Sequence, residues 1–101
     1  MQFHIVVLAG DGIGPEIIGE AQRVLTRVGE IYGHGFHYES HPAGGVAIEQ
    51  FDNPLPDATL KACQNSQAVL KGPFGGPKWD KLDNQRRPEA GILGLRRGLD
   101  L

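Results

Sequence analysis

The chain begins with a short apolar segment, after which apolar residues return every three or four positions. Residues 4–8, His-Ile-Val-Val-Leu, are rich in β-branched side chains and are followed by Gly10 and Gly12, which is typical of a buried β-strand. From Pro15 onward the spacing is helical, and charged residues occupy the opposite side. The apolar residues of this predicted helix are Ile17, Ala21, Val24, Leu25 and Val28. Pro15 suits its first turn, where the missing N–H is not needed.

Further along, strands and helices continue to alternate. Residues 36–42 mix polar and aromatic side chains and predict a second strand at a sheet edge, whereas 44–56 reads as irregular. Residues 57–66 predict a short helix, 68–74 a third strand, and 88 to about 98 a last helix. This order favours an α/β fold of right-handed βαβ units around a parallel sheet. Ligands of such sheets gather beyond the carboxyl ends of the strands.

The composition narrows the class of protein. With 101 residues, 40% of them hydrophobic and 22% charged, the chain holds at most one small globular domain. No apolar run approaches the roughly 20 residues that span a bilayer, so we expect no membrane partner. Its single cysteine, Cys63, excludes an internal disulfide and fits a reducing cytoplasm. We interpret it as a small buried residue on a helix.

The charges are divided unevenly along the chain. Residues 1–70 hold three basic and eight acidic side chains, and residues 71–101 hold seven basic and four acidic ones. Anionic ligands should therefore meet the last third of the chain. Only Trp79 could stack on a base there, so we expect no nucleic-acid partner.

Two local patterns suggest sites but carry little weight alone. The glycines at 10 and 12 open a dinucleotide fingerprint whose third glycine would fall at 15, where the chain has Pro15. We interpret this loop as a tight strand-to-helix turn, although the following helix start could also attract an anion. His37 and His41 would share a strand face but lie about 13 Å apart, too far to bind one metal ion directly.

The loop after the third predicted strand is richer in chemistry. Gly75, Gly76 and Pro77 let the backbone approach a ligand, Lys78 can meet an anion, and Trp79 can cover a flat ring. In the helix that follows, Glu89, Ile92, Leu93 and Arg96 fall on one face. This face would suit a small acid with an alkyl group, since arginine binds carboxylates in a bidentate manner. A plain amphipathic helix with Ile92, Leu93 and Leu95 in the core fits the spacing equally well.

Four segments together carry a resemblance to a known family. "LAGDGIGPEI", "GGVAIEQFDNPLPDATL", "AVLKGPFGGPKWD" and "RRPEAGILGLRR" resemble the start of the 3-isopropylmalate dehydrogenases, which are β-decarboxylating dehydrogenases. The order "GGPKWD" and then "RPE" is specific to this branch, whereas "GDGIGPE" is shared with isocitrate dehydrogenases. The resemblance covers residues 1–101, which would form an incomplete N-terminal part of the first domain, with a parallel or mixed sheet.

The resemblance implies an NAD-dependent oxidoreductase of leucine biosynthesis, a cytoplasmic homodimer that converts 3-isopropylmalate to 4-methyl-2-oxopentanoate. It implies a substrate carboxylate at Arg96 and the isopropyl group at Ile92, with Leu93 beside it. The catalytic Tyr and Lys and the aspartates that bind Mg²⁺ or Mn²⁺ would lie beyond Leu101, so this chain alone is expected to be inactive. The resemblance also implies a cofactor loop, which comprises Gly76, Pro77, Lys78, Trp79, Asp80, Lys81, Leu82, Asp83, Asn84, Gln85, Arg86, Arg87, Pro88 and Glu89.

The chain departs from the family pattern at Lys71 and Pro73, where isopropylmalate dehydrogenases usually have a small neutral stretch. The "KGP" sequence here is closer to that of isocitrate dehydrogenases. A sister enzyme acting on isocitrate, homoisocitrate or tartrate is therefore the first alternative. The second is a non-catalytic module that binds a nucleotide or a partner.

Overall fold

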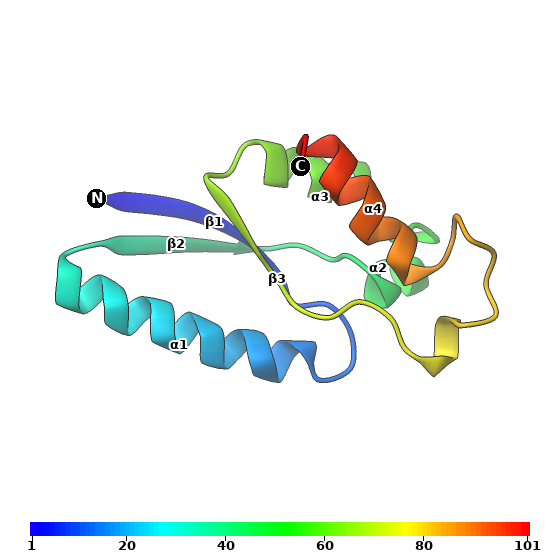
Figure 1. Ribbon diagram of the computed structural model, residues 1–101, viewed down its shortest axis with the longest axis horizontal. Helices are drawn as coiled ribbons and strands as arrows, with labels where there is room; N and C mark the ends of the chain where they lie inside the picture. The colour runs from blue at the N-terminus through cyan, green and yellow to red at the C-terminus, as the bar shows by residue number, and fades with distance from the viewer.

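The computed structural model describes residues 1–101 and contains one parallel three-stranded sheet with helices on both faces (Figure 1). The strand order is β2-β1-β3. Along the chain the elements are β1 (Gln2–Leu8), α1 (Gly14–Tyr32), β2 (Gly35–Ser40), α2 (Gly45–Phe51), α3 (Asp57–Gln64), β3 (Ala68–Lys71) and α4 (Pro88–Gly98). A single turn of 3-10 helix at Pro77–Trp79 interrupts the segment before α4.

The central strand explains why the sequence opens with an uninterrupted apolar run. β1 pairs in parallel with β2 from Gln2 opposite Gly35, and with β3 from Ile5 opposite Ala68. Helices cover both of its faces, so residues 5–8 are all buried. Val6 and Leu8 face α3 and α4 and pack with Cys63 and Leu95, which places the core on that side of the sheet.

The structure confirms the predicted α/β fold, the parallel sheet and the edge position of β2. It confirms α4 at Pro88–Gly98 and the burial of Cys63, which is 3% exposed. The prediction of an irregular segment at 44–56 was wrong, because residues 45–51 form α2. A seven-residue helix between glycines and prolines is too short to show a helical period.

β3 also ends earlier than predicted, at Lys71 instead of residue 74. The N–H of Gly72 still donates to the carbonyl of Leu8, at 2.8 Å, but Pro73 has no N–H to continue the ladder. The chain therefore turns away from the sheet at this proline.

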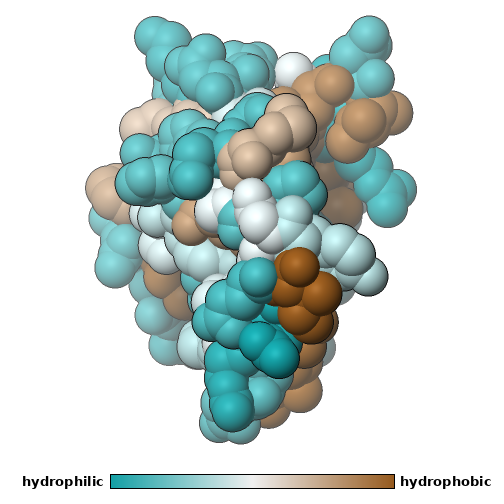
Figure 2. Space-filling view, turned by 90° about the vertical axis from the view of Figure 1, so that its left-hand side faces the viewer, coloured by the Kyte–Doolittle hydropathy of each residue, from teal (hydrophilic) through white to brown (hydrophobic).

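The side of α1 that meets the sheet differs from the predicted one. Ile18 and Gly29 are buried, and the predicted Ala21 and Leu25 are half-buried, whereas Ile17, Val24 and Val28 are exposed. The contacting row is thus displaced by one residue, and a neighbouring apolar row on α1 stays open to solvent. Figure 2 shows hydrophobic residues (brown) beside hydrophilic ones (teal) in the lower half of the view, where α1 lies. No helix of the structure has the length and apolarity needed to cross a membrane.

Candidate cofactor and substrate site

The candidate site lies where β1 and β3 end. Leu8 and Lys71 are register partners at these ends, so the loops that leave the two strands start side by side. A hydrogen bond of 2.8 Å from the N–H of Asp11 to the carbonyl of Pro73 joins them. Figure 1 shows α2, the first turn of α4 and the loop between β3 and α4 (yellow to orange) gathered at this end of the molecule. This is the edge at which a ligand of a parallel sheet is expected.

The first glycine loop is a tight turn, as predicted. Gly10 and Gly12 have φ angles of 79° and 58°, which side chains other than glycine rarely adopt. An added Cβ at Gly10 would lie 2.2 Å from the carbonyl oxygen of Pro73. Gly10 therefore serves the close approach of the two loops, whereas Gly12, with nothing within 4 Å of an added Cβ, serves only the turn.

Asp11, between these glycines, has a role that the sequence analysis missed. It is 3% exposed, and its Oδ2 accepts hydrogen bonds from the N–H groups of Gly45 and Gly75 at 2.7 and 2.8 Å. Its Oδ1 accepts from Val46 at 2.9 Å. One carboxylate thus joins the first turn of α2 to the loop after β3.

The predicted cofactor loop, residues 76–89, rests on α2 in this structure. The Trp79 ring covers Gly45 so closely that an added Cβ there would lie 2.3 Å from the ring. Lys78 pairs with Glu49, and Arg86 pairs with Asp52 at 2.6 Å. The hydrogen bond and charge of Asp52 raise the pKa of Arg86. Both ion pairs are exposed, so they orient the loop more than they stabilise it.

The middle of the loop is held by hydrogen bonds from its backbone to the side chain of Asp83. Asp83 Oδ1 accepts hydrogen bonds from the N–H groups of Gln85 and Arg86, at 3.1 and 3.0 Å, and so forms a turn. Lys81, Asn84 and Gln85 are exposed, and Leu82 is half-buried. This turn brings the chain back to Pro88 and the start of α4.

The end of the loop returns to its beginning. Glu89 lies so near Gly75 that an added Cβ at Gly75 would be 2.8 Å from its Oε1. Arg87 lies between two carboxylates, with its Nε 3.4 Å from Glu89 and its guanidinium 3.9 Å from Asp80. That Nε is buried and has no hydrogen-bond partner. The Glu89 carboxylate compensates the charge at ion-pair distance, and the hydrogen-bonding capacity of the Nε stays unused.

The burial of the apolar residues of α4 distinguishes a ligand-binding face from a plain core-facing helix, the two interpretations that its sequence allowed. Leu95 is buried in the core, Ile92 is half-buried, and Leu93 is 61% exposed. An ordinary core-facing helix would bury all three, so the exposed Leu93 favours a face that meets something else. Glu89 and Arg96 are both exposed on the same helix.

A second cation lies near Arg96. Burial first, and then the charge of Arg96, lowers the pKa of Lys71. The Lys71 ammonium also lies 4.4 Å from the centroid of the Phe74 ring. It donates a hydrogen bond of 2.8 Å to the carbonyl of Gly72, so this cation is held at the end of β3.

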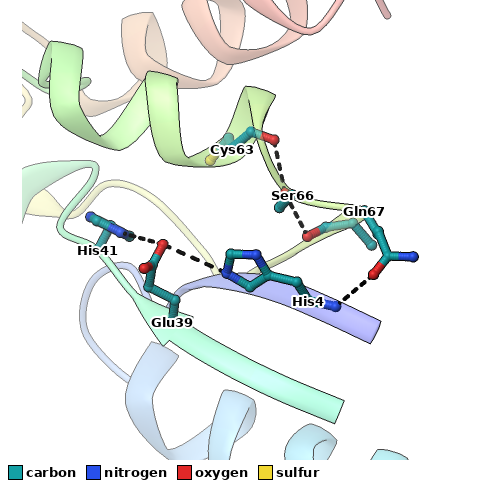
Figure 3. Close-up of polar contacts among 7 residues, drawn as sticks. His4, Glu39, His41, Cys63, Ser66 and Gln67 are labelled. Carbon is teal, nitrogen blue, oxygen red and sulfur yellow. Dashed lines mark hydrogen bonds and ion pairs between the residues drawn. The ribbon is translucent and has the colours of Figure 1, made fainter. Parts of the chain in front are cut away.

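A separate polar cluster lies across β1 and β2. Figure 3 shows Glu39 between two histidines, with its Oε2 3.0 Å from His41 Nε2 and 3.8 Å from His4 Nε2. Glu39 pairs in register with Val6, on the sheet face that carries the core. No group of three potential ligands (His, Cys, Asp or Glu) in the structure is arranged to hold a metal ion.

Comparisons with known proteins agree with this arrangement. Residues 4–101 match the family described as isocitrate/isopropylmalate dehydrogenase. The 3-isopropylmalate dehydrogenase of Aquifex aeolicus is 53% identical over 100 residues, which are 99% of this chain and 28% of that protein. The same enzyme of Rhodopirellula baltica is 50% identical over 101 residues, again 28% of its length. The chain therefore spans little more than a quarter of these curated relatives.

The fold is also found in solved structures. The crystal structure of isocitrate dehydrogenase from Methylococcus capsulatus superposes with a TM-score of 0.75 and 33% identity, over 97% of this chain and 26% of that one. A β-decarboxylating dehydrogenase from Thermococcus kodakarensis superposes with a TM-score of 0.64 and 30% identity, over 97% of this chain and 27% of that one.

Proposed function

Because the chain belongs to the isocitrate/isopropylmalate dehydrogenase family, we propose that it forms the N-terminal segment of a 3-isopropylmalate dehydrogenase. The reaction is the NAD-dependent oxidative decarboxylation of 3-isopropylmalate to 4-methyl-2-oxopentanoate. The observation that carries the proposal is the face of α4, which presents an exposed leucine and a half-buried isoleucine between a carboxylate and a guanidinium. Relatives that bear this enzyme's name are about half identical over the whole chain.

The proposal assigns roles to two parts of the chain. Residues 76–89 bind the nicotinamide half of NAD, with Glu89 near both nicotinamide and substrate. Arg96 binds a carboxylate of the malate part of the substrate, and Ile92 and Leu93 contact its isopropyl group. NAD, when bound, accepts the hydride that leaves the hydroxyl-bearing carbon. The chain's own residues bind and orient the reacting groups.

The residues present fit NAD better than they fit a metal ion. The buried Nε of Arg87, which forms an ion pair with Glu89 but no hydrogen bond, offers a donor, and the loop supplies further cations and one aromatic ring. A divalent metal would need ligands from outside these 101 residues, because the chain gathers no suitable set. Binding of Mg²⁺ or Mn²⁺, a homodimer and a cytoplasmic location are part of the proposal and rest on the family resemblance.

Isocitrate is the second candidate substrate, and one observation favours it. The "KGP" segment at residues 71–73 is closer to that of isocitrate dehydrogenases, and its Lys71 is a second cation for a second carboxylate. The apolar Ile92 and the exposed Leu93 favour isopropylmalate, because a second carboxylate would leave them against a charged group. We therefore give isopropylmalate precedence.

The test uses this chain together with its natural downstream sequence, and measures NADH production with each substrate. Arg96→Ala should lower kcat/KM for both, because a bidentate contact to a carboxylate is worth about 2–5 kcal/mol, or roughly 30-fold to several thousand-fold. Arg97→Ala is the matched control, since the adjacent exposed arginine should change kcat/KM little. Turnover of isocitrate alone would favour the second candidate. NAD binding without turnover of either substrate would indicate a non-catalytic module.

A further inference from the structure

Asp11 makes an unusual set of contacts for a buried acidic residue. Its carboxylate accepts three backbone hydrogen bonds, and none of the chain's ion pairs includes it. A buried charge must be compensated, and here the N–H groups of two distant segments do so. The contacts reach 34, 35 and 64 residues along the chain. The two segments can satisfy this carboxylate only while they stay close together.

Both segments belong to the surroundings of the predicted cofactor loop. Gly75 comes directly before that loop and lies against Glu89 at its far end. The Trp79 ring, which belongs to the loop, packs on Gly45. Because the same oxygen, Oδ2, binds the N–H groups of Gly45 and Gly75, it fixes the start of the loop relative to the surface on which its aromatic ring rests.

The other attachments of the loop to α2 are weaker. Lys78–Glu49 and Arg86–Asp52 are exposed ion pairs, which contribute little when water can replace them. The hydrogen bonds of Asp11 are charge-assisted and shielded from solvent, so each is stronger. Among the polar attachments, those of Asp11 therefore fix the start of the loop most firmly.

We infer that Asp11 is a positioning residue for NAD binding. It acts through Gly75 and through Gly45, on which Trp79 packs, and does not touch the cofactor. This inference rests on the proposed function. The "GDG" turn then has a second role besides its shape. The glycines allow the loops to approach each other, and the aspartate holds them in that position.

The test is Asp11→Asn in the chain with its natural downstream sequence. The amide keeps the size of the carboxylate, but its NH₂ group cannot accept, so one or two N–H groups lose their partner. We expect the KM and the calorimetric Kd for NAD to rise about 10- to 100-fold, as for the loss of a charge-assisted hydrogen bond. The KM for 3-isopropylmalate should change less than about threefold, because Arg96 lies on α4, which Asp11 does not contact.

Thr59→Val is the matched control for a purely structural effect. Thr59 is the other buried polar side chain, 1% exposed, and its hydroxyl donates to the carbonyl of Pro42 at 2.7 Å. This variant should lower the melting temperature without raising the KM for NAD. If Asp11→Asn behaves in the same way, or weakens NAD and substrate equally, Asp11 is only structural and the inference is wrong.

A second variant applies if Asp11→Asn does not fold. Val46→Pro removes the N–H that Oδ1 binds, in the first turn of α2, where that N–H has no partner within the helix. It should still raise the Kd for NAD more than the KM for substrate, and an unchanged Kd overturns the inference.

Turnover of isocitrate in place of isopropylmalate would refute the proposed substrate but leave the effect on NAD measurable. If the wild-type protein does not bind NAD at all, both proposals fall.

Discussion

Gly45→Ala should displace Trp79 and the start of the cofactor loop. An added Cβ would lie 2.3, 2.4 and 2.5 Å from three atoms of the indole ring, whereas ordinary contact begins at 3.4 Å. The difference between 3.4 and 2.3 Å means that the ring must move by about 1.1 Å. The backbone of Gly45 is held by Asp11, so the ring is the part that has to give.

The expected energies follow from overpacking. Forcing extra volume into a packed contact costs about 1–3 kcal/mol of unfolding free energy. Replacing a helical glycine by alanine returns about 0.5–1 kcal/mol, so the single variant should lose up to about 2.5 kcal/mol. When Trp79 is already alanine, the clash is absent and Gly45→Ala should be neutral or stabilising. The two substitutions should thus show a coupling energy of about 1–3 kcal/mol.

Urea unfolding of the wild type, both single variants and the double variant measures this coupling. Gly19→Ala is the control, because it lies inside α1 and no atom lies within 4 Å of an added Cβ. It should stabilise the protein by about 0.5–1 kcal/mol. Additivity of Gly45→Ala and Trp79→Ala within about 0.5 kcal/mol would refute the contact between glycine and ring.

Two further predictions concern the substrate and pH. Ile92→Ser should lower kcat/KM for 3-isopropylmalate about 10- to 200-fold and affect isocitrate less, as expected for a lost apolar contact. Equal losses for both substrates would assign Ile92 to packing. Burial raises the pKa of the Cys63 thiol, so unfolding free energy should be constant below the usual pKa of 9.0 and fall as the pH rises above it. Urea titrations at pH 7.5 and 10 should show that Cys63→Ala removes this decline, and an equal decline in the variant would mean that the buried thiol is not its cause.

The architecture could be predicted because its signals are local. The change from a β-branched run to helical spacing identified β1 and α1, and prolines and glycines marked the limits of α4. The face of α1 was displaced by one residue, because two neighbouring apolar rows run along this helix and the sheet contacts only one of them. α2 was missed because its first N–H groups bind Asp11, which lies 34 and 35 residues away.

The candidate site likewise has parts that local sequence patterns predict and parts that depend on distant contacts. Glu89, Ile92 and Arg96 could be placed on one face because they share a helix, and helical spacing is visible in the sequence. The exposure of Leu93 could not be predicted from that spacing, which suits a core-facing helix as well as a ligand face. It depends on what the rest of the fold packs against α4.

Asp11 shows why a correct interpretation of a motif can still miss its function. The two glycines beside it explain the turn completely, so nothing in the local sequence requires the aspartate between them. Its use appears only when the loops after β1 and β3 meet the start of α2, since that meeting buries the carboxylate beside three N–H groups. A buried charge is costly unless those groups stay in place, so the aspartate makes the arrangement of the two loops a condition for stable folding. A residue that links the fold to the candidate site in this way can be identified only from its contacts in the three-dimensional structure.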